Sequence, residues 1–240
     1  MKIRLLSDIH QEFYEDKELY KSQGEDVLVL AGDINVGPER VLSALKQFHE
    51  NQPHIIYVPG NHEYYGNNTR LFDDHISRFT RDSSISFLNP GSVTIAGVTF
   101  IGATLWTDFR SDAMAKAICA INISDFSLIR DFHTDECVKL NTQHLKYIRE
   151  AYSKTPGKKV IVTHFLPAVE CIAPIYRGPN LINYYFANDL GNEIADMQDT
   201  TWLFGHTHSL VDIMLGDTRV VANPYGYNRN PNYKECVIEV

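Results

Sequence analysis

The sequence of 240 residues lacks the features that mark several specialised classes of protein. No stretch approaches the ~18 consecutive apolar residues that a membrane-spanning helix needs. There is no internal repeat and no low-complexity tract, so a solenoid or a disordered chain is not expected. Basic residues number 22 against 30 acidic ones, and the net charge of −8 argues against binding a long nucleic-acid duplex. A small anionic ligand remains compatible with this charge, because bound metal ions can dominate the local electrostatics of a site.

Cysteine is scarce and its spacing is uninformative. No two of the four cysteines form a C-x-x-C pair, which is the spacing typical of thiolate zinc sites and redox motifs. We interpret them as reduced, mostly buried thiols of a cytoplasmic protein. The apolar part of residues 1–8 is too short for a signal peptide and predicts a first strand instead. The length suits one large domain, and no linker is visible, so residues 1–240 are expected to form a single domain.

Five short apolar segments predict buried strands, over residues 2–7, 26–31, 54–58, 159–163 and 201–204. Each segment ends at residues that can bind a metal ion, namely Asp8 and His10, Asp33, Asn61 and His62, His164, and His206 and His208. One histidine beside a core is more often structural. Ligand-type residues at the same end of successive strands are different, because ligands bind outside the carboxyl ends of strands in open α/β sheets.

The remaining pattern predicts an α/β fold. Helices are expected over residues 38–50, 68–81 and 112–121, and from an N-cap at Thr134 to near Gly157. A strand, a helix and a strand over residues 26–58 form the unit that builds parallel sheets. Ala96-Gly97 joins strands 92–96 and 98–105 as a hairpin, and strands 219–222 and 236–240 end the chain. Residues 11–25 are expected as a surface loop or short helix, and residues 167–198 as an irregular segment with one helix at its end.

The candidate ligands combine imidazole, carboxylate and amide groups. In extended backbone, alternate residues point the same way, so Asp8 and His10 are expected to reach one ion. His206 and His208 reach one ion by the same argument, or two different ions where the backbone turns. This donor set suits manganese, iron, zinc or cobalt, and the absence of cysteine argues against a structural zinc site. Seven ligands exceed one four-coordinate centre and therefore predict two ions, which Asp33 could bridge.

These motifs resemble those of the calcineurin-like metallophosphoesterase superfamily. The series is Asp8-x-His10, Gly32-Asp33, Gly60-Asn61-His62-Glu63, His164 and Gly205-His206-x-His208. All five motifs occur in order over residues 8–208. Residues 102–108 and 219–227 also resemble the small bacterial single-domain members. The resemblance implies a four-layer α/β/β/α sandwich with two mixed β-sheets.

The resemblance also implies a role for each motif residue. One metal ion is expected on Asp8, His10, Asp33 and His208, and the other on Asp33, Asn61, His164 and His206. Asn61 and His62 are expected to contact the substrate, and His62 to assist the leaving oxygen after attack by a metal-bridging hydroxide. Two divalent ions are the implied cofactors, with manganese favoured over iron, zinc, cobalt or magnesium. Glu63 is expected to have a structural role, either orienting a neighbour or capping the following helix.

Departures from the family pattern narrow the range of substrates that we expect. The protein phosphatases of the superfamily follow Gly-Asp with Asp-Arg, whereas this chain has Ile34-Asn35-Val36-Gly37, so a phosphoprotein substrate is less favoured. Phe165 stands where small bacterial members often have a second histidine. Asn35 is interpreted as a contact to substrate or as a turn residue. Six aromatic residues are candidates to stack on a flat substrate group, with packing of the loops as the alternative. They are Tyr64, Tyr65, Trp106, Tyr176, Tyr184 and Tyr185. Arg130 and Arg177 are candidate phosphate binders, with a solvated surface charge as the alternative.

The sequence therefore favours a phosphodiesterase that acts on a small organic or nucleotide substrate. A phosphomonoesterase or a nucleotide pyrophosphohydrolase with the same site is the alternative within the enzyme class. An alternative from another class is a non-catalytic scaffold of the same fold. The presence of His62 favours an enzyme, because a scaffold has no need of a histidine that faces the metals without binding them. The sequence does not indicate an oligomeric state.

Overall fold

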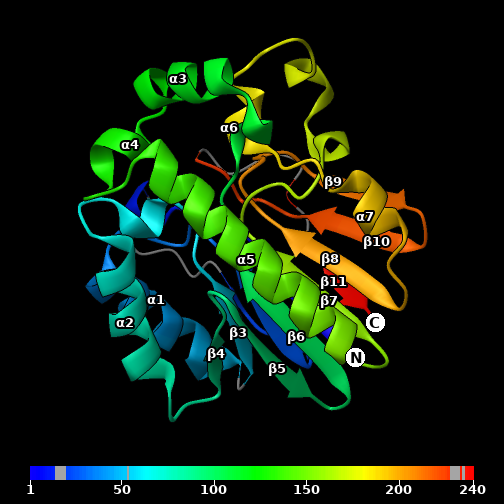
Figure 1. Ribbon diagram of the computed structural model, residues 1–240. Helices are drawn as coiled ribbons and strands as arrows, with labels where there is room; N and C mark the ends of the chain where they lie inside the picture. Colours follow the sequence, from blue (N-terminus) through cyan, green and yellow to red (C-terminus); the bar gives the residue numbers. More distant parts are fainter. Residues whose placement is uncertain (14–19, 53, 228–232, 234–235) are drawn as a thin grey trace.

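The computed structural model describes all residues except 14–19, 53, 228–232 and 234–235. Two mixed β-sheets lie face to face, and helices cover their outer faces (Figure 1). The first sheet has the order β11-β1-β2-β3-β4, with bounds Val237–Glu239, Lys2–Leu6, Val27–Ala31, Ile55–Val58 and Ile85–Phe87. The second has the order β5-β6-β7-β8-β10-β9, with bounds Gly91–Ile95, Val98–Ala103, Lys159–Thr163, Thr200–Phe204, Thr218–Ala222 and Val211–Leu215.

The central strands of both sheets are parallel, and three of the four edge strands, β11, β5 and β9, are antiparallel to their neighbours. In the first sheet β1 to β4 run parallel and β11 runs against β1. In the second sheet β6, β7, β8 and β10 run parallel, while β5 and β9 pair as edge hairpins. The predicted fold class is confirmed. The parallel arrangement matters for function, because it brings the carboxyl ends of strands from distant parts of the sequence to one edge.

Three apolar cores separate four layers, because strand side chains alternate between faces. Val27 and Val29 of β2 point into the core between the sheets, where they join residues such as Val160 and Val162 of β7. Leu28, on the other face of β2, packs in the outer core that also contains residues of α1 (Pro38–Asn51) and α2 (Thr69–Thr80). The outer core of the second sheet contains residues of α5 (Thr134–Lys154) and α7 (Gly191–Ala195). The result is the expected α/β/β/α sandwich.

The sequence missed two strands and placed one cap wrongly. β4 has only three residues, and β9 is an edge strand whose side chains alternate between exposed and half-buried, so neither forms a continuous apolar run. Thr134 is the first residue of α5 and not its N-cap. His133 holds that position, without a side-chain hydrogen bond.

The connecting segments contain more helix than predicted. Residues 167–198 hold η4 (Val169–Cys171), η5 (Pro174–Tyr176), α6 (Asn183–Phe186) and α7. The segment between β6 and α5 contains η3 (Phe109–Ser111), α3 (Ala113–Asn122) and α4 (Asp125–Leu128). Two further short turns, η1 (Gln11–Phe13) and η2 (His62–Tyr64), follow β1 and β3 and lie directly beside the candidate ligands.

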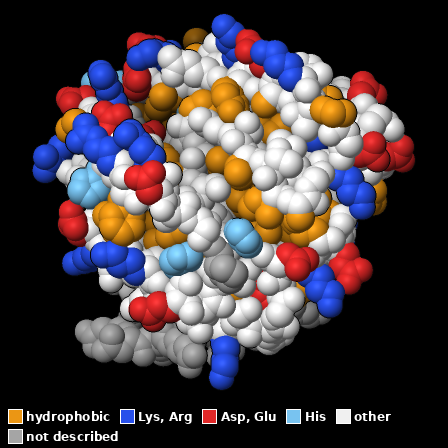
Figure 2. Space-filling view, turned by 90° about the horizontal axis from the view of Figure 1, so that it is seen from below, with side chains coloured by type: hydrophobic (Ala, Val, Ile, Leu, Met, Phe, Trp, Pro, Cys, Tyr) orange, Lys and Arg blue, Asp and Glu red, His pale blue; other side chains and the backbone are white. Residues whose placement is uncertain are grey.

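Charged side chains of both signs surround the face seen in Figure 2, and hydrophobic side chains gather around a hollow near its centre. No extended basic surface covers that face, as expected from the net charge of −8. Over the described part of the chain, none of the helices combines the length and the apolar character that crossing a bilayer requires.

Candidate metal centre

The predicted ligands meet where the two sheets present the carboxyl ends of five parallel strands. Asp8 and His10 follow β1, Asp33 follows β2, and Asn61 follows β3 of the first sheet. The second sheet contributes the others, with His164 after β7 and both His206 and His208 after β8. The seven side chains fall into two groups that share Asp33.

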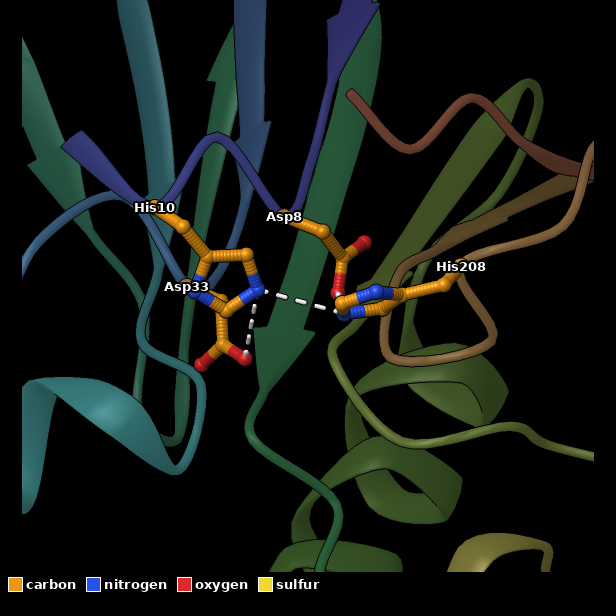
Figure 3. A group of neighbouring side chains, drawn as sticks. All are labelled: Asp8, His10, Asp33 and His208. Atoms are coloured by element: carbon orange, nitrogen blue, oxygen red, sulfur yellow. Dashed lines mark hydrogen bonds and ion pairs between the residues drawn. The ribbon is translucent and has the colours of Figure 1, made fainter. Parts of the chain in front are cut away.

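The first group, which we call the Asp8 cluster, consists of Asp8, His10, Asp33 and His208 (Figure 3). One ligand atom from each residue lies within 4.8 Å of the others. The Nε2 atoms of His10 and His208 are 3.2 Å apart, and His10 Nε2 is 3.7 Å from Asp33 Oδ2. His208 Nε2 lies 3.4 Å from Asp8 Oδ1. Nitrogen and oxygen atoms that converge in this way suit a cation between them.

The second group, which we call the His164 cluster, consists of Asp33, His164 and His206, with Asn61 beside them. His164 Nε2 is 3.5 Å from Asp33 Oδ1 and 3.1 Å from Asn61 Oδ1. The Nε2 atom of His206 is buried and, within the described part of the chain, has no hydrogen-bond partner. A buried nitrogen without a partner costs free energy unless it binds something else. These residues therefore fit a divalent cation.

Most of the candidate ligands have an unusual backbone conformation. Asp8, His10, Asp33, His206 and His208 all have φ between 48° and 65°, in the left-handed region that non-glycine residues rarely adopt. Such strain concentrates at functional sites, where the surrounding structure imposes it. The expectation of extended backbone at Asp8-x-His10 is wrong, although both side chains reach the same cluster. His206 and His208 lie in different clusters because the chain turns at both residues.

Glycine is required where the loops that carry the ligands cross. A Cβ atom on Gly32 would lie 2.4 Å from His164 Nδ1, and one on Gly60 would lie 2.2 Å from Asp33 Oδ1. Both distances are far below van der Waals contact, so a side chain at either position would displace His164 or Asp33 from its place in the site. This explains why glycine precedes Asp33 and Asn61 in the sequence motifs.

Glu63 joins the loops that follow β2 and β3. Its buried carboxylate accepts hydrogen bonds from the backbone N–H groups of Asp33 (3.0 Å), Ile34 (2.9 Å) and Gly60 (2.9 Å), and from the Tyr57 hydroxyl (3.3 Å). Burial raises the pKa of Glu63 to about 8, whereas the four donors favour the ionised form. The expected structural role is supported by this geometry, but the partners are the ligand loops and not the following helix.

His62 lies beside the clusters without joining either of them. Its backbone N–H donates to Asp33 Oδ1 at 2.9 Å. Its ring nitrogen Nδ1 is 3.0 Å from Glu12 Oε1, and Nε2 is 3.1 Å from the Tyr227 hydroxyl. Burial alone would lower the pKa of His62, but the Asp33 charge and the Glu12 hydrogen bond raise it to about 9. Bound cations would oppose this rise.

Electrostatics distinguish the two aspartates from the histidines around them. Burial alone would raise the pKa of Asp33, but the charges of His164 and His62 hold it well below its usual range. Burial also works against ionisation of Asp8, and the hydrogen bond and charge of His208 lower its pKa to about 2. For His164, the two carboxylates outweigh burial and raise the pKa to about 10. The centre therefore stabilises anionic oxygens facing cationic groups.

Three residues of the site were missed by sequence reasoning. Glu12 was assigned to a surface loop, yet its side chain is 9% exposed and contacts both His10 and His62. Buried Asp125 accepts hydrogen bonds from Asn61 Nδ2 (3.1 Å) and the Tyr65 hydroxyl (2.7 Å), and it contacts the Tyr185 hydroxyl. Tyr227 stacks on His10 with ring centroids 4.2 Å apart. Only Glu12 carried a signal, in the spacing Asp8-x-His10-x-Glu12.

Several aromatic candidates do not face solvent. Tyr64, Trp106 and Tyr185 are at most 1% exposed and pack in the core, so they are not available to stack on a substrate. Tyr65 is half-buried beside Asp125, and Tyr184 lies under the Arg110 guanidinium group at 4.3 Å. Of the six, Tyr176 alone is largely exposed, at 61%.

The other residues singled out in the sequence have local partners. The Arg177 guanidinium group donates to the main-chain oxygens of Ile172 and Glu170. Asn35 accepts from the backbone N–H of Val36, as a turn residue does, and its amide group is 3.4 Å from Gln11. Phe165 is fully buried and contacts the His206 ring at 4.1 Å between centroids. None of these contacts indicates a phosphate site.

Comparison with known proteins places these features in context. A sequence model of calcineurin-like phosphoesterases matches residues 1–210. The uncharacterized protein L509 of Acanthamoeba polyphaga mimivirus is 27% identical over 266 residues, covering 96% of this chain and 92% of the viral protein.

Two solved structures share the fold. Phosphopantetheinyl hydrolase from Mycobacterium tuberculosis superposes with a TM-score of 0.79 at 19% identity, over 97% of this chain and 93% of that chain. A dimetal phosphatase from Danio rerio has a TM-score of 0.53 at 15% identity, over 98% of this chain and 90% of the other. At these identities the superpositions establish the common architecture.

Proposed function

The chain belongs to the calcineurin-like phosphoesterase family, and from this premise we propose that it is a two-metal hydrolase of small phosphodiesters. The observation that carries the proposal is the pair of ligand clusters sharing Asp33. One ion would be held by Asp8, His10, Asp33 and His208, and the other by Asp33, Asn61, His164 and His206. Two divalent ions, when bound, lower the pKa of a coordinated water and neutralise charge on the phosphate oxygens.

The protein's own groups have defined tasks in this proposal. His62 Nε2 points at the Tyr227 hydroxyl, so it already has an oxygen atom at hydrogen-bond distance, 3.1 Å away. When a substrate binds, the leaving oxygen takes the place of this hydroxyl and receives the proton from His62. Tyr227 is 43% exposed, so its ring can turn toward solvent to make room. Asn61 borders the same space and, besides binding the ion, would contact the phosphate.

The donor chemistry favours manganese among the candidate ions. Imidazole and carboxylate donors occur in both clusters, the amide of Asn61 lies beside the His164 cluster, and none of the four cysteines belongs to either. Such ligands suit manganese, iron, zinc or cobalt, and manganese accepts the mixed nitrogen and oxygen set. We also propose that residues 1–240 act as one domain, because the site takes ligands from residues 8 to 208 and the central core contains strands of both sheets.

The preference for a diester rests on the surroundings of the site. A tightly bound phosphate monoester carries two negative charges, which proteins commonly meet with arginine. The sequence offered Arg130 and Arg177 for such a contact. The guanidinium group of Arg177 binds main-chain oxygens, and Arg130 lies exposed at the surface. The name of the Mycobacterium tuberculosis protein makes phosphopantetheinyl esters one class of substrate to include in the assay.

The test is hydrolysis of bis(p-nitrophenyl) phosphate and of p-nitrophenyl phosphate by metal-stripped protein reloaded with manganese. The expected result is two ions per chain by elemental analysis and a clear preference for the diester. A preference for the monoester would overturn the diester assignment and identify a phosphomonoesterase. On diesters with alkyl leaving groups, His62→Asn is expected to lose about 10²–10⁴-fold in rate with both ions retained. No activity of the wild type on any diester or monoester, with two ions bound, would favour the scaffold alternative.

A further inference from the structure

A carboxylate outside both ligand clusters connects them to His62. Glu12 Oε1 lies 3.1 Å from Nδ1 of His10 and 3.0 Å from Nδ1 of His62. The two imidazole rings meet edge to face with centroids 4.4 Å apart. A single oxygen atom therefore contacts one candidate metal ligand and the residue proposed to assist the leaving group.

We propose that Glu12 is a positioning residue that fixes the orientation and the tautomer of both His10 and His62. This inference rests on the proposed function, because it assigns Glu12 a task in the same reaction. An ionised carboxylate can only accept hydrogen bonds, so the neutral forms of both rings must carry their proton on Nδ1. The proton that His62 gives to the leaving oxygen is then a second one, held on Nε2 of the doubly protonated ring. Nε2 of each ring is then the atom turned away from Glu12.

The consequence for each ring follows from what its Nε2 atom faces. His10 Nε2 lies 3.2 Å from His208 Nε2 and 3.7 Å from Asp33 Oδ2, so its lone pair is directed into the Asp8 cluster. His62 Nε2 lies 3.1 Å from the Tyr227 hydroxyl, on the side of the site where the leaving oxygen is proposed to lie. One hydrogen-bond acceptor thus directs one histidine toward a metal and the other toward the substrate.

The backbone around Glu12 is held firmly enough for this task. His10 N donates to Asp33 O at 2.9 Å, Gln11 N donates to Ile34 O at 3.0 Å, and Phe13 N donates to His10 O at 3.0 Å. These bonds attach η1 to the loop that carries Asp33. Glu12 therefore keeps a constant distance from the shared aspartate, as a positioning group must.

The second carboxylate oxygen of Glu12 indicates that this residue is present for its function. Glu12 Oε2 is buried and has no hydrogen-bond partner among the residues that the structure describes. A buried carboxylate oxygen without a donor is unfavourable for folding, so stability alone would favour an apolar or amide side chain at this position. The residue is explained by what Oε1 does for the two histidines.

The same three residues are also close enough to hold a cation, because His10, Glu12 and His62 each present an atom within 4.8 Å of the others. The protonation of His10 argues against a cation bound between these three residues. An ion bound to His10 Nδ1, together with one in the Asp8 cluster at Nε2, would require His10 to lose both ring protons. Hydrogen bonds to Glu12 need no such ionisation. A third ion is therefore an outcome to be tested against the proposal.

The first experiment reads the tautomers directly, by nitrogen-15 NMR of the histidine rings in metal-free and zinc-loaded protein. In the wild type, His10 and His62 are expected to carry their protons on Nδ1. Glu12→Ala is expected to abolish this preference at His62, while Glu12→Gln, which keeps an acceptor oxygen of the same reach, retains it. Glu39→Gln is the matched control, because Glu39 makes an exposed contact of 3.5 Å with His75 on the helices α1 and α2.

The second experiment measures hydrolysis of diesters whose leaving groups differ in acidity. Glu12→Ala is expected to lose about 10–100-fold on alkyl diesters, which need a proton, and much less on p-nitrophenyl diesters, which do not. Glu12→Gln is expected to restore most of the loss. Adding Glu12→Ala to His62→Asn should cause little further loss on alkyl diesters, because both changes remove one function.

The outcomes separate this inference from the proposed function. An inactive wild type, or an unaffected His62→Asn, would refute the proposed function, and the NMR tautomers would still decide the role of Glu12. Unchanged tautomers and a uniform loss across all leaving groups in Glu12→Ala would overturn the positioning role. So would a third bound ion in the wild type that Glu12→Ala removes.

Discussion

The two ligand clusters share Asp33 but are held in place by different means. In the His164 cluster, His164 Nδ1 contacts the main-chain oxygen of Ala31 at 2.9 Å, and Asn61 is anchored to buried Asp125. In the Asp8 cluster, His10 depends on the side chain of Glu12, and His208 is 28% exposed. A main-chain partner cannot rotate away, whereas a side-chain partner can. We infer that the His164 cluster is the more rigid half of the centre.

This difference in rigidity is expected to affect how tightly each cluster binds its ion. Groups that support a metal ligand from outside typically change metal affinity by about 10–100-fold when they are removed. The more rigidly held half is expected to retain its ion longer. The asymmetry is therefore expected to appear as two unequal affinities for the same metal ion. The predictions below test this comparison, beginning with the residue that both halves share.

Asp33→Asn should disrupt both clusters at once, so that no difference between them is left to measure. The substitution deletes the negative charge that both clusters share and that lies 3.7 Å from His10 and 3.5 Å from His164. We expect both ions to be lost together and the diesterase rate to fall by roughly 10⁴-fold or more, at or beyond the upper range for losing a single proton donor. Elemental analysis and steady-state kinetics measure the two effects. Retention of one tightly bound ion would show that the clusters do not depend on a shared carboxylate.

Asp125→Asn should weaken one half and spare the other. Asp125 accepts from the Asn61 amide, and this bond leaves Asn61 Oδ1 facing the His164 cluster. An asparagine at position 125 offers a donor as well as an acceptor, so the amide of Asn61 loses its fixed orientation. We expect the affinity for one of the two ions to fall by about 10–100-fold, with the other unchanged. Metal-binding calorimetry on stripped protein measures both affinities.

The control for this prediction is Tyr185→Phe, which removes another donor to Asp125 but leaves the Asn61 contact. It should change both affinities little. An equal loss at both ions in Asp125→Asn would contradict the division into separately supported halves.

Sequence reasoning succeeded where chemistry and neighbours along the chain coincide. Each apolar strand and the candidate ligand that ends it are adjacent in sequence, so the strands were identified, and the structure brings the seven candidate ligands together at their ends. It failed where a partner is remote. Asp125 lies 64 residues from Asn61, and Tyr227 lies 165 residues from His62, and no local pattern connects them.

Backbone conformation was the second limit on what the sequence could predict. The argument from extended geometry at Asp8-x-His10 assumed alternating side chains, whereas both residues have positive φ. Contacts between distant loops impose that conformation, including the bonds from Asp8 N to Gly32 O and from His10 N to Asp33 O. Intrinsic preferences of aspartate and histidine do not predict it, so it becomes visible only in the folded chain.

The buried His144, which lies outside the metal centre, can be compared with His164 to show how neighbouring charges set the direction of a pKa shift. His144 on α5 is as buried as His164, but it faces no carboxylate, and its Nδ1 accepts a hydrogen bond from Leu105 N at 3.1 Å. Burial therefore lowers the pKa of His144 to about 3, whereas two aspartates raise that of His164 to about 10. Similar burial thus gives opposite pKa shifts, because only His164 of the two lies beside the charges of Asp33 and Asp8.

The His144 shift predicts how stability depends on pH. Its pKa is lower in the folded chain than the ordinary 6.5, so the unfolded chain binds more protons between about pH 3 and 6.5. The contribution of His144 to stability is complete above pH 6.5 and declines as the pH falls, by about 1.4 kcal/mol for each unit well below 6.5. His144→Gln keeps an acceptor for Leu105 and removes the titration. Urea unfolding of metal-free protein at pH 7.5 and 5.5 should therefore show a smaller loss of stability in the variant than in the wild type. Equal losses would mean that His144 is already protonated in the folded chain, and that burial does not separate it from His164.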